Sequence, residues 1–193
     1  WARGLGDVYK RQTLAKGIAS SYIPFGAVAV SAEINAPFES GETHFIHGFT
    51  NGGHPLGCAA GSELIDIIRD ENLLENCRKQ SEVLFSYREQ LLAHPTVRDV
   101  RGWGLMMVLE LIKDKESLDF FDSSLQAEKL YSAITLKHGL VMYGSLYGPR
   151  RQAAFKRGLP SWISPPLTIS SEEMHDLVSR LDSALSEWES IVL

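Results

Sequence analysis

TLAKGIASSYIPFGAV, residues 13–28, places a single lysine, Lys16, among uncharged side chains, directly before a glycine and ahead of a β-branched stretch. Desolvation penalises the charged form of an amine, so a lysine held in such a segment gains neutral, nucleophilic character. A neutral lysine amine can form a Schiff base with a carbonyl compound. The alternative is that Lys16 runs along its apolar neighbours and keeps its ammonium in water.

A second segment, HFIHGFTNGGHP at residues 44–55, is rich in glycine and contains one hydroxyl side chain, Thr50. Glycines allow a backbone to approach an anion closely, and a threonine hydroxyl together with free amide groups can bind phosphate oxygens. Pro55 stands where a helix is expected to begin, because proline fits the first helical position. We therefore expect a phosphate-binding turn that leads into a helix.

Taken together, TLAKGIASSYIPFGAV and HGFTNGGHPLGCAAG closely resemble the class III aminotransferases, which are pyridoxal 5′-phosphate enzymes of fold type I. The resemblance continues through VRDVRGWGLMMVLEL and WISPPLTISSEEM, and it covers residues 13–193. It implies that Lys16 forms the Schiff base with the cofactor and that Thr50 binds the cofactor phosphate of the neighbouring subunit. The assembly implied by this exchange is a homodimer.

The activity implied by the resemblance is transfer of an amino group from an amine or ω-amino acid to a 2-oxo acid such as pyruvate. Lys16 would hold the cofactor and then act as general base and acid in the proton shift. The chemistry of a decarboxylase, a racemase or an aminomutase stays open, because a fold does not decide among reactions. A non-catalytic, truncated domain is a further alternative.

The composition is that of an ordinary globular protein, with 44% hydrophobic and 22% charged residues and a net charge of −5. This acidic balance argues against nucleic acid as a partner. No apolar run reaches the ~20 residues of a membrane helix, so we expect neither a membrane span nor a signal peptide. Cys58 and Cys77 lack metal-ligand spacing, and we expect reduced thiols in a cytoplasmic protein. A disulfide between them is the alternative.

The expected fold class is α/β: the C-terminal part of a fold type I large domain, followed by a small α/β domain with a mostly antiparallel sheet. Residues 13–94 are assigned to the large domain and residues 95–193 to the small one. Residues 1–12 do not fit the family's approach to the lysine and are expected to be an atypical leader outside the fold. The family's aspartate for the pyridine nitrogen, its stacking aromatic and its first phosphate loop have no counterpart here. We therefore expect a fragment that is inactive alone.

Hydrophobic periodicity predicts the secondary structure. Residues 26–31 are expected to form a buried strand. Residues 32–45 are expected to be mostly a loop, with a short helical turn as the alternative. Helices are predicted from Pro55 and from residues 73–92, and another over residues 125–138, where Gly139 ends it. Further strands are predicted at residues 97–101, 105–112, 140–143 and 162–164.

The last helix is expected to begin after Ser170 or Ser171, with Glu172 and Glu173 in its first turn, where the helix dipole favours anions. Its apolar residues recur at helical spacing and predict a stripe that packs in the core. This stripe consists of Met174, Leu177, Val178, Leu181, Leu185 and Trp188.

Three histidines, His44, His47 and His54, lie close together in the sequence. A metal site usually needs further cysteine, histidine or carboxylate ligands, and no nearby cysteine completes a set. We therefore expect no metal here, and we expect His54 to belong to the turn that enters the helix.

Arginines are the usual ligands of a substrate carboxylate, because a guanidinium matches it bidentately. Some class III members carry such an arginine before the small-domain triplet, where this chain has Trp162 instead. A basic loop at residues 144–160 offers alternatives or is only a solvated surface; its candidates are Arg150, Arg151 and Arg157. Arg98 and Arg101 are expected to form salt bridges at the domain junction.

Overall fold

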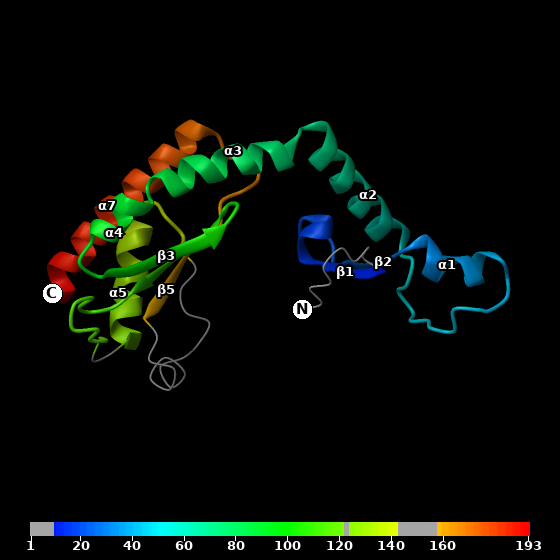
Figure 1. Cartoon of the computed structure of the whole chain (residues 1–193), viewed down its shortest axis with the longest axis horizontal. Coiled ribbons are helices and arrows are strands. Elements are labelled where there is room, and N and C mark those ends of the chain that lie inside the picture. Colours follow the sequence, from blue (N-terminus) through cyan, green and yellow to red (C-terminus); the bar gives the residue numbers. More distant parts are fainter. Residues whose placement is uncertain (1–9, 122–123, 143–157) are drawn as a thin grey trace. The chain divides into compact units, whose positions relative to one another are not determined.

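The computed structural model describes residues 10–121, 124–142 and 158–193, which form two compact units. The first unit ends at Asn72 and the second begins at Leu73 (Figure 1). This division lies earlier than the domain boundary predicted after residue 94. The reason is that helices α3 (Leu73–Ser86) and α4 (Arg88–Ala93) bury Leu84 and Leu91 in the core of the second unit.

The N-terminal unit begins with an antiparallel hairpin of β1 (Arg11–Ala15) and β2 (Gly26–Val30). Residues 1–12 are predicted to lie outside the fold, yet Arg11 and Gln12 form part of β1. The strand predicted at residues 26–31 is present, but its burial is not found, since Val28 is 62% exposed. A two-stranded hairpin cannot bury its own faces, and the described helix α2 contacts this region through the turn after β1.

Two helices follow the hairpin. Helix α1 (Ala32–Glu39) takes up the first part of the segment predicted to be mostly loop, and residues 40–45 are outside helices and strands. The Ser31 hydroxyl caps α1 by accepting a hydrogen bond from the Ile34 amide. The helix contains one proline, Pro37. Helix α2 (Pro55–Asp70) begins with Pro55 at its first position, which confirms the prediction.

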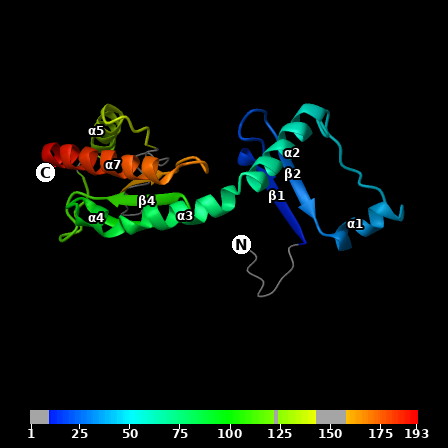
Figure 2. The same ribbon diagram turned by 90° about the horizontal axis from the view of Figure 1, so that it is seen from above.

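The C-terminal unit is built on an antiparallel sheet in the order β3-β4-β5. Its strands are β3 (Val97–Trp103), β4 (Met106–Leu111) and β5 (Leu159–Ile163). Helices α5 (Ser124–Lys137) and α7 (Ser171–Val192) pack together, and α7 also contacts α3 (Figure 2). Helices combined with antiparallel sheets confirm the α/β fold class.

Alternate residues of β4, Met107, Leu109 and Leu111, are fully buried and form the centre of the core. The apolar stripe of α7 packs onto them, as predicted: Met174, Val178, Leu181, Leu185 and Trp188 are all buried. Leu177 is partly buried against the same core.

The ends of the helices in this unit follow the capping rules. Ser170 caps α7 in a capping box with Glu173, which decides between the two predicted serines. Helix α5 stops before Gly139, whose φ of +78° suits glycine. The strand predicted at residues 140–143 is not found over 140–142, and Tyr143 lies outside the described residues. The Leu140 amide instead donates to the Thr135 carbonyl and completes the end of α5.

Candidate functional site

Lys16 lies directly after the last paired residue of the hairpin, where Ala15 opposes Gly26. It is the first residue of the short 3-10 helix η1 (Lys16–Ala19), and its φ of +57° is left-handed. The desolvation expected from its uncharged neighbours is not found, because Lys16 is exposed in this chain. Its ammonium forms no ion pair with any residue in the described part of the chain. The structure therefore places this amine at the surface of the N-terminal unit.

The turn after Lys16 is held by its own backbone and by α2. The Ser20 amide donates to the Gly17 carbonyl over 3.1 Å, and the Tyr22 amide donates to the Ala19 carbonyl over 3.0 Å. The ring of Phe25 lies against two glycines of α2, Gly57 and Gly61. This contact fastens residues 16–25 to the first half of α2.

Thr50 is exposed in a turn just before α2. The Gly52 amide donates to the Phe49 carbonyl over 2.9 Å, and Gly53 has a φ of +66°, so the turn has the tight, glycine-dependent form that the sequence predicts. Within the described ranges the Thr50 hydroxyl has no hydrogen-bond partner. Thr50 and the turn of Lys16 thus both adjoin the first half of α2, within one unit.

The three histidines occupy different environments. His47 lies between two phenylalanine rings, with centroid distances of 5.8 Å to Phe45 and 6.2 Å to Phe49. His54 is the residue before α2, as predicted. No group of three or more histidine, cysteine or acidic side chains able to hold a metal occurs among the residues that the structure describes.

Other side chains predicted to matter are distributed over both units. Cys58 in α2 and Cys77 in α3 are free thiols. The carboxylate-binding candidates Arg150, Arg151 and Arg157 lie outside the described residues. No helix in the described ranges is long and apolar enough to span a membrane.

The predicted salt bridges of two arginines are confirmed, within the sheet of the C-terminal unit. Arg101 pairs with Asp99 over 2.7 Å and with Glu110 over 2.9 Å. Arg98 lies 3.6 Å from the same Glu110. The two pairs with Glu110 join β3 to β4, whereas the pair with Asp99 lies within β3, so both arginines have a structural role.

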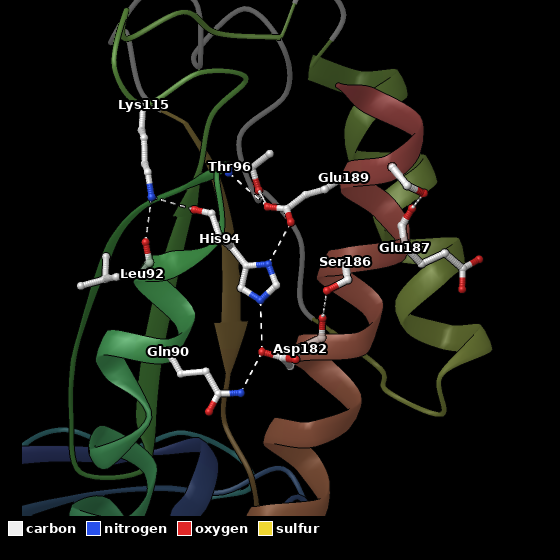
Figure 3. A network of polar contacts seen from close by, with 10 residues as sticks. Gln90, Leu92, His94, Thr96, Lys115, Asp182, Ser186, Glu187 and Glu189 are labelled. Carbon is white, nitrogen blue, oxygen red and sulfur yellow. Dashed lines mark hydrogen bonds and ion pairs between the residues drawn. The ribbon is translucent and has the colours of Figure 1, made fainter.

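The C-terminal unit also contains a buried polar cluster around His94, which connects the end of α4 to α7 (Figure 3). The hydrogen bond to Glu189 raises the pKa of His94 against the opposing effect of burial. Burial raises the pKa of Glu189, but hydrogen bonds from His94 and Thr96 outweigh it and leave this pKa below its usual value. His94, Thr96 and Glu189 bond to one another and not to an open surface, which is typical of a structural element.

The sequence as a whole matches the family model of class III aminotransferases over residues 7–185. The chain belongs to the class III aminotransferase family. The matched range contains the turn of Lys16, the turn of Thr50 and almost all of the C-terminal unit.

Relatives and solved structures agree with this family. An aminotransferase of Gibberella zeae is 35% identical over 93% of the chain, and a putrescine–pyruvate aminotransferase of Pseudomonas aeruginosa is 33% identical over 97%. The crystal structure of an (S)-enantioselective ω-transaminase from Thermomicrobium roseum has a TM-score of 0.77 and 34% identity over 95% of the chain. A pyridoxal-phosphate-bound aminotransferase from Vibrio fluvialis has a TM-score of 0.78, 26% identity and the same coverage.

This class III chain is short relative to its family. It spans 35% of the Gibberella zeae protein, 38% of the Pseudomonas aeruginosa protein, 38% of the Thermomicrobium roseum structure and 39% of the Vibrio fluvialis structure. The described residues include the turn of Lys16 and the glycine-rich turn of Thr50, and both turns adjoin α2. The contact of Phe25 with Gly57 and Gly61 joins the turn of Lys16 to α2, and the motifs did not indicate these three residues as site residues.

Proposed function

We propose that the full-length protein is a pyridoxal-phosphate-dependent transaminase, with Lys16 as the residue that binds the cofactor covalently. The observation on which this rests is the exposed Lys16 in a left-handed turn, directly after a paired strand, inside a segment matched by the family model. The cofactor-bound Vibrio fluvialis structure supports the choice of cofactor.

The described residues fit this cofactor chemically. The Lys16 amine has no ion pair in the described part of the chain, and the Thr50 hydroxyl is likewise without a partner there, next to a glycine-rich turn. When bound, pyridoxal phosphate supplies the electron sink for chemistry at an amine carbon. Lys16 Nζ would hold the carbonyl carbon of the cofactor and later accept and return a proton. Thr50 Oγ1 would donate a hydrogen bond to a phosphate oxygen.

The proposed assembly is a homodimer in which Thr50 serves the cofactor of the neighbouring subunit. Residues 13–94 are proposed to belong to the large domain and residues 95–193 to the small domain. The free thiols of Cys58 and Cys77 support a cytoplasmic location.

The proposed reaction transfers an amino group from an amine or ω-amino acid to a 2-oxo acid such as pyruvate. The putrescine–pyruvate aminotransferase and the ω-transaminase among the relatives support these substrate classes. A carboxylate-binding arginine from Arg150, Arg151 and Arg157 is part of the proposal. Decarboxylase, racemase and aminomutase chemistry are the alternatives within the same family.

The test is a half-reaction of the full-length protein, loaded with pyridoxal phosphate and mixed with one amine and no acceptor. A transaminase converts one equivalent of amine to carbonyl product and then stops until pyruvate is added. Lys16→Ala should abolish turnover, while Lys10→Ala, an exposed lysine paired with Glu33, should leave it unchanged. Release of carbon dioxide, racemised product or a shifted amino group would contradict amino transfer.

A further inference from the structure

The ring of Phe25 packs against a part of α2 that has no side chains, because Gly57 and Gly61 form it. A Cβ atom built on Gly57 would lie 2.9 Å from Phe25 Cδ2, and one on Gly61 would lie 2.8 Å from Phe25 Cε1. Both distances are shorter than carbon atoms tolerate, so the ring sits directly on the helix backbone. Gly57 and Gly61 are four residues apart and therefore share one face of α2.

The turn that this contact fastens is conformationally unfavourable. Lys16, Ser20 and Ser21 have φ values of +57°, +45° and +62°, a left-handed geometry that side chains other than glycine rarely adopt. Residues keep such a backbone conformation only where the surrounding structure holds them in it, and they concentrate at functional sites. Two backbone hydrogen bonds within the turn and the hairpin pair Ala15–Gly26 hold the turn on one side.

We propose that Phe25 is a positioning residue for Lys16, and that Gly57 and Gly61 form the seat that fixes its ring. Phe25 directly precedes Gly26, so its ring anchors the far end of the turn that Lys16 begins. A built Cβ on Gly61 also lies 3.6 Å from the Ile18 carbonyl, which places the backbone of η1 on the same helix face. The inference rests on the proposed function of Lys16, and it adds the residues that hold the amine in place.

The two glycines allow a test in which a clash is created and then relieved. Gly61→Ala places its new Cβ against Cε1, an atom that Phe25→Leu removes. Gly57→Ala places its Cβ against Cδ2, which has a counterpart in leucine. We therefore expect Phe25→Leu to rescue Gly61→Ala and not Gly57→Ala. Ser62→Ala, at an exposed position of α2, is the matched control for altered helix propensity.

The first measurement uses the full-length protein without cofactor and does not depend on its function. NMR backbone shifts of Lys16 and Ser20, and exchange of the Ser20 and Tyr22 amides, report whether the turn keeps its geometry. In Gly61→Ala we expect the left-handed shifts to be lost and amide exchange to rise roughly tenfold or more, with return toward the parent in the double variant. An unchanged turn in Gly61→Ala would overturn the proposal. If Gly61→Ala does not fold, Phe25→Leu alone is measured: loss of the ring contacts should loosen the turn by a smaller factor, the level to which the double variant also returns, and an unchanged turn would overturn the proposal.

The second measurement uses the full-length protein and pyridoxal phosphate as the probe. We expect Gly61→Ala to slow formation of the cofactor's absorbing adduct by roughly 10- to 100-fold and to shift the pH midpoint of its visible band, both restored by Phe25→Leu. Loss of thermal stability without either change would assign Phe25 a merely structural role and overturn the proposal. A parent protein that forms no adduct at Lys16 would instead refute the proposed function, and the two failures are thus distinguishable.

Discussion

The Nδ1 atom of His94 lies 2.8 Å from Oε2 of Glu189, and the opposite ring nitrogen lies 3.2 Å from Oδ1 of Asp182. One imidazole thus bridges two carboxylates on α7 (Figure 3). A neutral imidazole has a single N–H and can donate to only one of them, whereas the protonated ring donates to both. Next to this cluster, the Lys115 ammonium donates hydrogen bonds to the backbone carbonyls of Leu92 and His94.

The first prediction is a loss of stability at alkaline pH through His94. Its pKa is raised in the folded state, so its contribution is fully present below ~6.5, the ordinary histidine value, and is lost as the pH rises through the raised pKa. Glu189 acts in the opposite direction, because its lowered pKa makes its contribution disappear only as the pH falls through that value. We expect His94→Gln to cost about 1–3 kcal/mol at pH 6 and less at pH 9, measured by denaturant unfolding.

His138→Gln is the control for this prediction. His138 also pairs with a glutamate of α7, Glu187, which is more exposed than Glu189. A His94→Gln penalty that does not decrease between the two pH values would show that the ring contributes packing and not charge.

The second prediction concerns the start of α7. The Ser170 hydroxyl accepts from the Glu173 amide, and the Glu173 carboxylate accepts from the Ser170 amide. Ser170→Ala removes the cap and should lower the free energy of unfolding by about 1 kcal/mol. Ser179→Ala, an exposed position in the same helix, should leave it unchanged or raise it slightly. Equal effects of the two variants would mean that the capping box contributes nothing.

The third prediction is unequal protection of the two units in this chain on its own. The core of β4 is fully buried, whereas large apolar side chains in the N-terminal unit are exposed, among them Tyr22 at 90% and Ile46 at 95%. Such surface favours opening and association. In hydrogen–deuterium exchange we expect β4 amides to be protected long after those of β2 have exchanged. Uniform protection across both strands would contradict this expectation.

The fourth prediction addresses the glycine-rich turn. Thr50→Ala in the full-length protein should weaken retention of pyridoxal phosphate by about 1.5–3 kcal/mol, the value of a hydrogen bond to a charged group. Affinity for pyridoxal, which lacks the phosphate, should not change. Asn51→Ala, the adjacent exposed residue, is the control. Equal losses for both cofactor forms would argue that Thr50 acts through the fold of the turn.

Helices were predictable from the sequence where a residue that signals the N-terminus precedes apolar residues at helical spacing. Pro55 and the apolar spacing defined α2, and Ser170, Glu173 and the stripe through Trp188 defined α7. Burial of β2 was not predictable in this chain, because it depends on partners beyond the strand itself. The length of helix α1 was underestimated, because the Ser31 cap lies before a stretch that looks polar and contains a proline.

The residues of the candidate site were likewise only partly predictable from the sequence. The roles of Lys16 and Thr50 are proposed from the resemblance of two contiguous motifs to the family, which can be recognised without the fold. Phe25 is not identified in this way, because its role appears only once the turn is packed on α2. The spacing of Gly57 and Gly61 was the available clue: glycines four apart in a helix indicate a close neighbour on that face.

Covalent labelling tests the central claim most directly. The full-length protein is loaded with pyridoxal phosphate, reduced with borohydride, digested and mapped by mass spectrometry, with Lys16→Ala as the control. The account predicts one stoichiometric pyridoxyl label on Lys16 and none in the variant. A stoichiometric label on any other lysine, or an equal label in Lys16→Ala, would contradict it.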